Sequence, residues 1–189
     1  MKRSLITLAL TAAQLAPALA QVDVAKSSVP QGFPSVIVAI SKQMGVPVEG
    51  KFKRFTAQIS FDPAKPAEGK ASVDIDIASF DLGADDFNRE TVKPEWFNAA
   101  KFPKATFVTS AIKPAGAGKF EATGKLTIKG ITRDVVAPVS FRAEGGQQVF
   151  EGVLPIKRLA FNIGEGAWKD TSTGADDVQI RCRIVTARK

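Results

Sequence analysis

The stretch KFEATGKLTIKGITR, Lys119 to Arg133, decides the fold of this 189-residue chain. Small or apolar side chains alternate along it with polar ones. The apolar side consists of Phe120, Ala122, Gly124, Leu126 and Ile128. The polar side consists of Glu121, Thr123, Lys125, Thr127 and Lys129. A period of two, with one buried face and one solvent-exposed face, is typical of an antiparallel strand that covers an apolar core.

The same alternation recurs on both sides of this stretch, between turns rich in proline and glycine. Strands are expected at residues 35–43, 51–61, 71–80, 106–112, 120–130, 134–142, 149–157 (continuing to 163) and 178–187. Asp81–Pro94 is a polar, acidic loop by composition, with room for one helical turn, and Pro94–Asn98 is expected to form a short helix because proline suits a first helical turn.

Eight one-faced strands without a long helix predict an all-β domain. Closure into an eight-stranded antiparallel barrel would bury every apolar face and remove the sheet edges. A sandwich of two sheets is the alternative that the pattern leaves open.

Residues 1–20 have the features of a cleaved signal peptide and are not expected to belong to the fold. A basic start (Lys2, Arg3) precedes an apolar core (Leu5–Leu15), and Ala18-Leu19-Ala20 provides the cleavage site. The sequence therefore predicts an exported protein located in the periplasm, with one domain over residues 21–189.

Composition excludes several classes of function. The chain has no histidine, which removes histidine-based triads and histidine metal sites, and no other catalytic signature is present, so no enzyme is predicted. The single cysteine, Cys182, shares its parity with apolar neighbours and is expected in the core. The lysines and arginines behind the net charge of +7 are dispersed along the chain, which argues against nucleic acid. A transient contact with an anionic membrane fits that charge, although an ordinary lysine-rich surface is the favoured interpretation.

Three polar features invite a sharper interpretation. Asp74 and Asp76 lie two apart, but strand geometry places both on the wet face, where lysines of the next strand can screen them, so no metal site is expected. Gly164-x-Gly166 lacks the third glycine of a phosphate cradle. Arg133 and Arg158 suit a ligand head group, although ion pairs with Asp62, Asp81 or Asp134 are favoured.

The size of the barrel leaves its interior undecided, since eight strands enclose either a filled core or one small ligand. The inward set mixes large residues such as Phe55, Phe61 and Phe150 with small ones such as Ala57 and Gly124. Small inward residues leave room unless neighbouring phenylalanine rings fill it.

The sequence resembles the YceI-like family of periplasmic lipid- and polyisoprenoid-binding proteins. The resemblance covers nearly all of the mature chain, in order. It is carried by the segments KQMGVPVEGKFKRF (42–55), ISFDPAKP (59–66), VDIDIASFDLG (73–83), WFNAAKFPKATF (96–107), GKLTIKGITRDV (124–135), KRLAFNIGEGAWKDT (157–171) and DDVQIRCRI (176–184).

This resemblance implies a lipocalin-like barrel, capped by a helix near Trp96, whose channel holds a long polyisoprenoid, isoprenoid quinone or fatty-acyl chain for storage or transport. It implies no catalytic residues, no metal and no cofactor other than such a bound lipid or quinone. The channel positions would be Phe55, Ile59, Phe61, Val73, Ile75, Ile77, Phe107, Leu126, Ile128, Phe141 and Phe161. Trp96, Phe97 and Trp168 are expected to plug the barrel ends and to contact the ligand as well.

Two other functions stay open at this stage. A filled barrel could act as a stress-response or interaction protein through its loops Asp81–Thr91 and Gly164–Gly174. An accessory role beside a quinone-using enzyme is the second. Either a monomer or a homodimer fits the sequence.

Overall fold

The computed structural model describes residues 35–187, and within them ten strands form one antiparallel sheet. The strands are β1 (Val36–Gln43), β2 (Val46–Phe52), β3 (Phe55–Ser60), β4 (Lys70–Asp76), β5 (Phe80–Asp81), β6 (Lys104–Gly116), β7 (Lys119–Ile128), β8 (Ile131–Glu144), β9 (Gln147–Lys157) and β10 (Asp177–Ala187). The helical elements are α1 (Asp85–Thr91) and the 3-10 turns η2 (Pro66–Glu68), η3 (Ile77–Ser79), η4 (Arg158–Phe161) and η5 (Gly166–Lys169). The predicted signal peptide lies outside the described residues.

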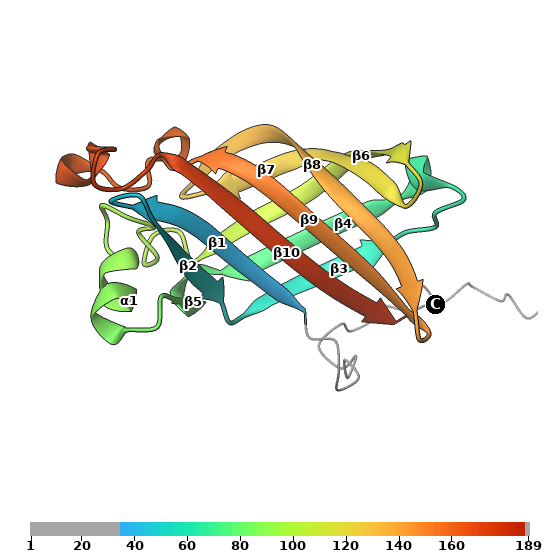
Figure 1. Cartoon of the computed structure of the whole chain (residues 1–189), viewed down its shortest axis with the longest axis horizontal. Coiled ribbons are helices and arrows are strands. Elements are labelled where there is room, and N and C mark those ends of the chain that lie inside the picture. Colours follow the sequence, from blue (N-terminus) through green and yellow to red (C-terminus); the bar gives the residue numbers. More distant parts are fainter. Residues whose placement is uncertain (1–34, 188–189) are drawn as a thin grey trace, which may run out of the picture.

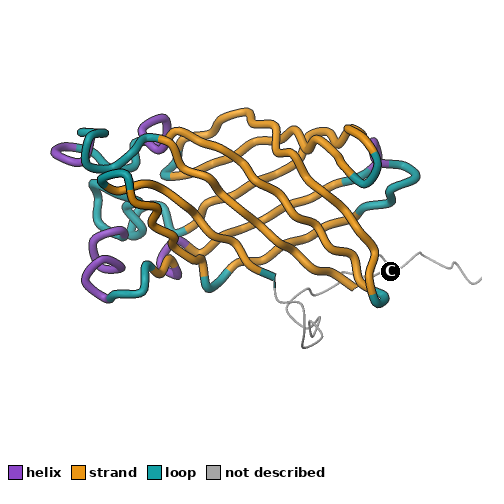
Figure 2. Tube along the Cα trace, in the orientation of Figure 1, coloured by secondary structure: helices purple, strands orange, loops and turns teal. Residues whose placement is uncertain are grey.

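The strand order, β3-β4-β6-β7-β8-β9-β10-β1-β2-β5, shows how the sheet curls (Figures 1 and 2). β2 pairs with β1 and β3 pairs with β4, although β2 and β3 follow each other in the chain. The chain therefore passes from one end of the strand order to the other at Lys53–Arg54. The all-β prediction is confirmed, but the sheet has ten strands instead of eight and its pairing ends at β3 and β5. A single sheet also excludes the sandwich.

Two-residue turns join three of the hairpins. Met44-Gly45, Lys129-Gly130 and Gly145-Gly146 all have positive φ at both residues. Type I′ turns require this conformation, and their twist matches the twist of the flanking strands. Consecutive long strands therefore stay in register from β7 through β9.

The strand expected at residues 51–61 is broken, and β2 begins earlier, where a bend was expected. The 3-10 turn η3 causes the break: the backbone N–H groups of Lys53 and Arg54 donate to the carbonyl and hydroxyl oxygens of Ser79, at 3.1 and 3.0 Å. Residues 77–79, expected as part of a strand, therefore leave the ladder to anchor the bend. Strand alternation in the sequence does not reveal such an exchange of hydrogen bonds.

The helix expected at Pro94–Asn98 is absent, and α1 lies earlier, within the loop where one helical turn was expected. Residues 94–98 form turns because the N–H groups of Phe97 and Asn98 donate to the carbonyls of Thr91 and Lys93. The strand expected to continue to residue 163 is also wrong: the chain leaves β9 into η4 and ends that turn at Asn162, which has a φ of 54°.

The opening stretch forms β7 as predicted. Its residues Phe120, Ala122, Leu126 and Ile128 are buried in the core. On the opposite face the Nζ atom of Lys125 lies 2.9 Å from a carboxylate oxygen of Asp134 in β8. Among residues 35–187 no helix has the length and hydropathy needed to cross a membrane.

Candidate functional site: the apolar interior

The interior of the curled sheet keeps apolar surface that is not fully buried. Along β8, for example, half-buried Val135 and Val139 alternate with exposed Val136 and Pro138. Outside the short strand β5, the half-buried apolar residues of the strands that pack against the main core are Ala39, Phe55, Ala57, Ile59, Ile75, Phe107, Ile131, Val135, Leu154, Ile156, Ile180 and Cys182. Fully packed interiors leave such side chains little accessible area. We call this set the inner belt.

One end of the interior is filled by four phenylalanine rings. The Phe61 ring lies 4.9 Å from that of Phe120, 5.2 Å from that of Phe141 and 5.7 Å from that of Phe150, measured between ring centroids. The Nε2 atom of Gln148 donates to the Phe61 carbonyl at 3.2 Å and holds the segment in place. We call these four residues the phenylalanine cluster.

The opposite end carries a second aromatic group built on different segments. The Phe52 ring lies 4.7 Å from Phe80 and 6.4 Å from Phe97, and the Trp96 and Trp168 rings are 5.2 Å apart. Trp96 packs against the main core, whereas Trp168 is 42% exposed. The aromatic side chains therefore run from the core to the surface at this end.

Arg158 organises the loops of that end. Its guanidinium is buried and donates to five carbonyl oxygens, those of Ile163, Gly164, Trp168, Gly174 and Ala175. A Cβ at Gly164 would collide with it, which explains the glycine there. Burial lowers the pKa of this guanidinium from its usual value, yet an arginine stays charged at neutral pH. The favoured pairing of Arg158 with Asp62, Asp81 or Asp134 is therefore wrong; the carboxylate whose charge acts on it is that of Asp176.

Arg133 also differs from its favoured interpretation. Its Nε donates to the Ala160 carbonyl at 2.8 Å, and its guanidinium lies 5.7 Å from the centroid of the Phe161 ring. Both arginines thus stabilise the loop after β9 through carbonyl oxygens.

Lys129 forms a second buried link at the same end. Its Nζ lies 2.7 Å from each of the carbonyls of Pro94 and Asn162 and from a carboxylate oxygen of Glu165. All three protons of the ammonium therefore have acceptors, as a buried lysine requires. The hydrogen bond and charge of Lys129 lower the pKa of Glu165. Sequence alternation predicted that Lys129 lies on the solvent-exposed face. Alternation alone does not reveal that the turn at Lys129 directs its side chain beneath the loops of Pro94 and Asn162.

The small inward residues do not all leave room. A Cβ on Gly124 would lie 2.8 Å from the Phe107 ring, so that ring fills the space beside the glycine. Ala57, in contrast, is half-buried and belongs to the inner belt. The accessible part of the interior is therefore the belt between the aromatic ends.

Two chemical groups in the interior stand out. The indole Nε1 of Trp96 is buried and has no hydrogen-bond acceptor among the described residues. The Cys182 thiol lies beside Gly152, and burial raises its pKa. The first is an unused donor, and the second is an unreactive thiol that can report on its surroundings.

The acidic residues of β4 support no metal site. Asp74 faces Lys104 at 3.6 Å, and Asp76 bonds Arg54 at 2.8 Å while capping η3. No group of three or more potential metal-ligating side chains occurs in residues 35–187.

The fourteen predicted ligand contacts fall into three groups. Val73, Ile77, Leu126, Ile128 and Phe161 are fully buried. Phe55, Ile59, Phe61, Ile75, Trp96, Phe97, Phe107 and Phe141 are half-buried and pack against the core clusters. Trp168 is exposed at the end. Ligand contact by any of them stays a prediction, and the second group has the accessible surface that it requires.

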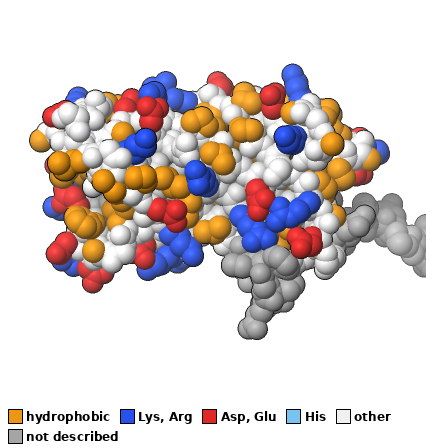
Figure 3. Space-filling model, viewed as in Figure 1, with side chains coloured by type: hydrophobic (Ala, Val, Ile, Leu, Met, Phe, Trp, Pro, Cys, Tyr) orange, Lys and Arg blue, Asp and Glu red, His pale blue; other side chains and the backbone are white. Residues whose placement is uncertain are grey.

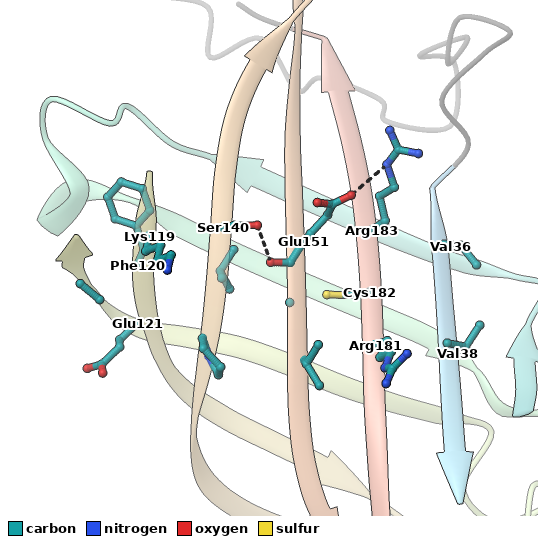
Figure 4. A pocket seen from close by; sticks show the side chains of 15 residues that line it. Val36, Val38, Lys119, Phe120, Glu121, Ser140, Glu151, Arg181, Cys182 and Arg183 are labelled. Carbon is teal, nitrogen blue, oxygen red and sulfur yellow. Dashed lines mark hydrogen bonds and ion pairs between the residues drawn. The ribbon is translucent and has the colours of Figure 1, made fainter. Parts of the chain in front are cut away.

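A separate groove of about 600 Å³ lies across the outer face of β7, β8, β9, β10 and β1 (Figure 4). Its floor carries Val38, Val153 and Pro138, and an ion pair of 3.4 Å joins Arg183 to Glu151. Glu151 also binds Arg142, which lowers the pKa of the Glu151 carboxyl. Its lining also includes Cys182, a member of the inner belt.

Comparison with known proteins identifies the family. The model of the YceI-like domain matches residues 21–186. The chain belongs to the YceI-like family. A UPF0312 protein of Ectopseudomonas mendocina is 32% identical over 146 residues, which are 74% of each chain. The expectation based on the sequence segments is thereby confirmed.

Two solved structures have a fold similar to that of this chain. The crystal structure of Burkholderia cenocepacia BcnA matches with a TM-score of 0.80 and 55% identity, covering 81% of this chain and 96% of that one. A polyisoprenoid binding domain from Saccharophagus degradans shares the fold, with a TM-score of 0.66, 15% identity and coverage of 82% and 94%.

Proposed function

We propose that this YceI-like protein holds one long apolar molecule in its interior and serves as a carrier or store for it in the periplasm. The inner belt is the observation that supports this proposal: half-buried apolar side chains line an interior closed by aromatic residues at both ends. A linear hydrocarbon chain is the ligand shape that suits such a belt, and the polyisoprenoid binding domain of similar fold agrees with it.

Apolar burial would supply the binding energy. Each methylene group removed from water contributes about 0.8 kcal/mol, so a long isoprenoid or acyl chain exceeds the cost of losing its own freedom. For a quinone or another ligand with a carbonyl group, the indole N–H of Trp96 is the donor that we propose for its oxygen. The protein itself supplies no reactive group in this proposal.

The first experiment is native mass spectrometry of the protein purified from the periplasm, followed by solvent extraction and lipid identification. We expect one long-chain lipid per protein molecule. A mass without ligand, unchanged after incubation with a quinone and with a polyprenyl phosphate, would contradict the proposal.

A matched pair of variants locates the ligand. Ala57→Phe places a ring in the inner belt, whereas Gln58→Phe places the same ring on the exposed face of the same strand. We expect the first variant to lose at least about tenfold in lipid affinity, because it removes space that several methylene groups would occupy. The second should bind like the wild type. Equal affinities would exclude the interior as the binding site.

The competing function is a filled barrel that acts through its loops. The phenylalanine cluster and the ring that fills the space beside Gly124 favour it, because both replace cavity by packed side chains. Under this alternative Ala57→Phe would leave function intact, whereas changes in the loops 81–91 and 164–174 would abolish it.

A further inference from the structure

Four large apolar side chains are exposed together at the end of the molecule that carries α1. They are Met44 at 81% exposure, Phe87 at 64%, Val46 at 62% and Trp168 at 42%. Figure 1 shows the β1–β2 hairpin tip, α1 and the loop after β9 side by side at this end, and the surface view shows apolar side chains there among charged ones (Figure 3). We call these four residues the tip set.

The rest of the exposed apolar surface is different. The other large hydrophobic residues exposed in the described part of the chain are Val108, Val136 and Val153, which lie on the outer faces of β6, β8 and β9, with Val153 on the floor of the groove. Exposed valines on strand faces are normal on a soluble surface, whereas Met, Phe and Trp exposed on neighbouring loop tips at one end are not.

Hydrogen bonds fix the loops that present the tip set. The N–H of Met44 donates to the Thr173 carbonyl at 2.8 Å, and the N–H of Ala175 donates to the Lys42 carbonyl at 2.9 Å. Arg158 bonds the carbonyls of both Trp168 and Gly174. In α1, the Asn88 side chain donates from Nδ2 to the Asp81 carboxylate and accepts a hydrogen bond from the N–H of Leu82. The apolar side chains are thus displayed by ordered backbone, which reduces the entropy lost on binding.

The charges near the tip set cancel. Arg89 pairs with Asp86, and Lys93 pairs with Glu90. The remaining charged side chains of the segments 42–46, 85–91 and 166–170 are two lysines and two aspartates: Lys42, Lys169, Asp85 and Asp170. The end is therefore electrically balanced on a chain whose net charge is +7.

We propose that the tip set docks this end of the protein onto a zwitterionic lipid bilayer, with the four side chains entering the headgroup–acyl boundary. Tryptophan favours that boundary, and small apolar protrusions insert there without a complementary protein surface. A second protein copy is the weaker occupant, because four separated side chains offer much less than the roughly 800 Å² per partner of a stable protein interface. The balanced charge matches a headgroup layer without net charge. The inference does not depend on what the interior holds.

The test is flotation of the full mature protein with phosphatidylcholine vesicles, with and without added phosphatidylglycerol, at low and high salt. We expect binding to pure phosphatidylcholine that high salt does not abolish. The variant Met44→Ser/Val46→Ser/Phe87→Ser should lose about tenfold or more in lipid affinity. The matched control Val108→Ser/Val136→Ser/Val153→Ser removes three exposed apolar residues from the strands and should bind like the wild type.

A second readout places the tryptophan. Trp168 is the exposed one of the two tryptophans of the chain, so brominated lipid should quench the protein's emission in the wild type and less in Trp168→Ser. Equal binding by the triple variant and its control, binding only with phosphatidylglycerol at low salt, or self-association abolished by the triple variant would each overturn the proposal. Lipid extraction from the interior is a separate measurement, so failure here leaves the proposed carrier function untouched.

Discussion

The two ends of the molecule are closed in different ways. The phenylalanine cluster closes one end with ring contacts and no charged group, whereas the loop end is closed by Arg158 and Lys129, whose buried charges bond carbonyl oxygens of neighbouring loops. Ring contacts are many and individually weak, so removing one costs little stability. Charge-assisted hydrogen bonds are few, and removing the one charged group breaks all of them at once. We therefore expect the loop end to respond to single substitutions and to pH, and the ring end to respond to lost volume.

The largest effect is expected from Arg158→Met, which leaves five carbonyl oxygens, buried or partly buried, without their donor. We expect a loss of about 3–5 kcal/mol in the free energy of unfolding, the usual cost of breaking a buried charged network. Urea denaturation measures it. The control Arg181→Met removes an exposed arginine from β10 and should change stability by less than about 0.5 kcal/mol. Equal effects would remove the contrast between the ends.

Phe61→Ala tests the opposite end. Phe61 contacts the other three rings of the phenylalanine cluster, but it is only half-buried. We therefore expect a loss of about 2–3 kcal/mol, below the range for a fully buried phenylalanine. Phe61→Leu should recover much of the stability, since it restores most of the volume. A loss as large as that of Arg158→Met would show that the two ends do not differ in this way.

The link between Lys129 and Glu165 predicts that the stability of the loop end depends on pH. The pKa of Glu165 is lower in the folded protein than in the unfolded chain, so its contribution is present above the unfolded value of about 4.5 and is lost as the pH falls through the folded value. The difference in stability between wild type and Glu165→Gln should therefore shrink on acidification below that value. Thermal unfolding across this range is the measurement, and a constant difference would contradict it.

The smallest effect concerns the Cys182 thiol. Burial raises the pKa of Cys182, so alkylation of the folded protein should be slow at neutral pH. The reaction should accelerate only when the pH exceeds the pKa of a free thiol. Because Cys182 belongs to the inner belt, a bound lipid should slow the reaction further. Rapid labelling that is indifferent to lipid would place the thiol outside the ligand's reach.

The sequence predicted the features that depend on alternation and missed those that depend on distant contacts. The apolar face of β7 follows directly from its period of two, and so does the wet-face position of Asp74. The break at Lys53–Arg54 could not be found in this way, because the hydroxyl of Ser79 that bonds it lies 25 residues away. The acidic start of α1, Asp85-Asp86, was a readable helix signal, but seven residues are too few for a clear apolar stripe.

The site shows the same division. Phe55 and Ile75 were predicted to face inward, and they belong to the inner belt. Arg158 was singled out for its charge, yet the carbonyls that surround it come from a loop whose path only the folded chain defines. Lys129 was assigned to the wet face, because alternation ends at a turn and the side chain there points wherever the turn directs it.

The pairing of β1 with β10 has a consequence for how the chain folds. Val36 lies opposite Arg183, so the first and last described strands are neighbours although nearly the whole domain separates them in sequence. Loops of this length close slowly, and all-β domains rich in such pairings fold in milliseconds to seconds. The hairpins β1–β2 and β6 to β9 can form early, but β1 can join the rest of the sheet only once β10, the last strand, is in place. A circular permutation that joins the two termini and opens the chain at Gly145-Gly146 would make this pairing local, and it should speed refolding while leaving the sheet unchanged.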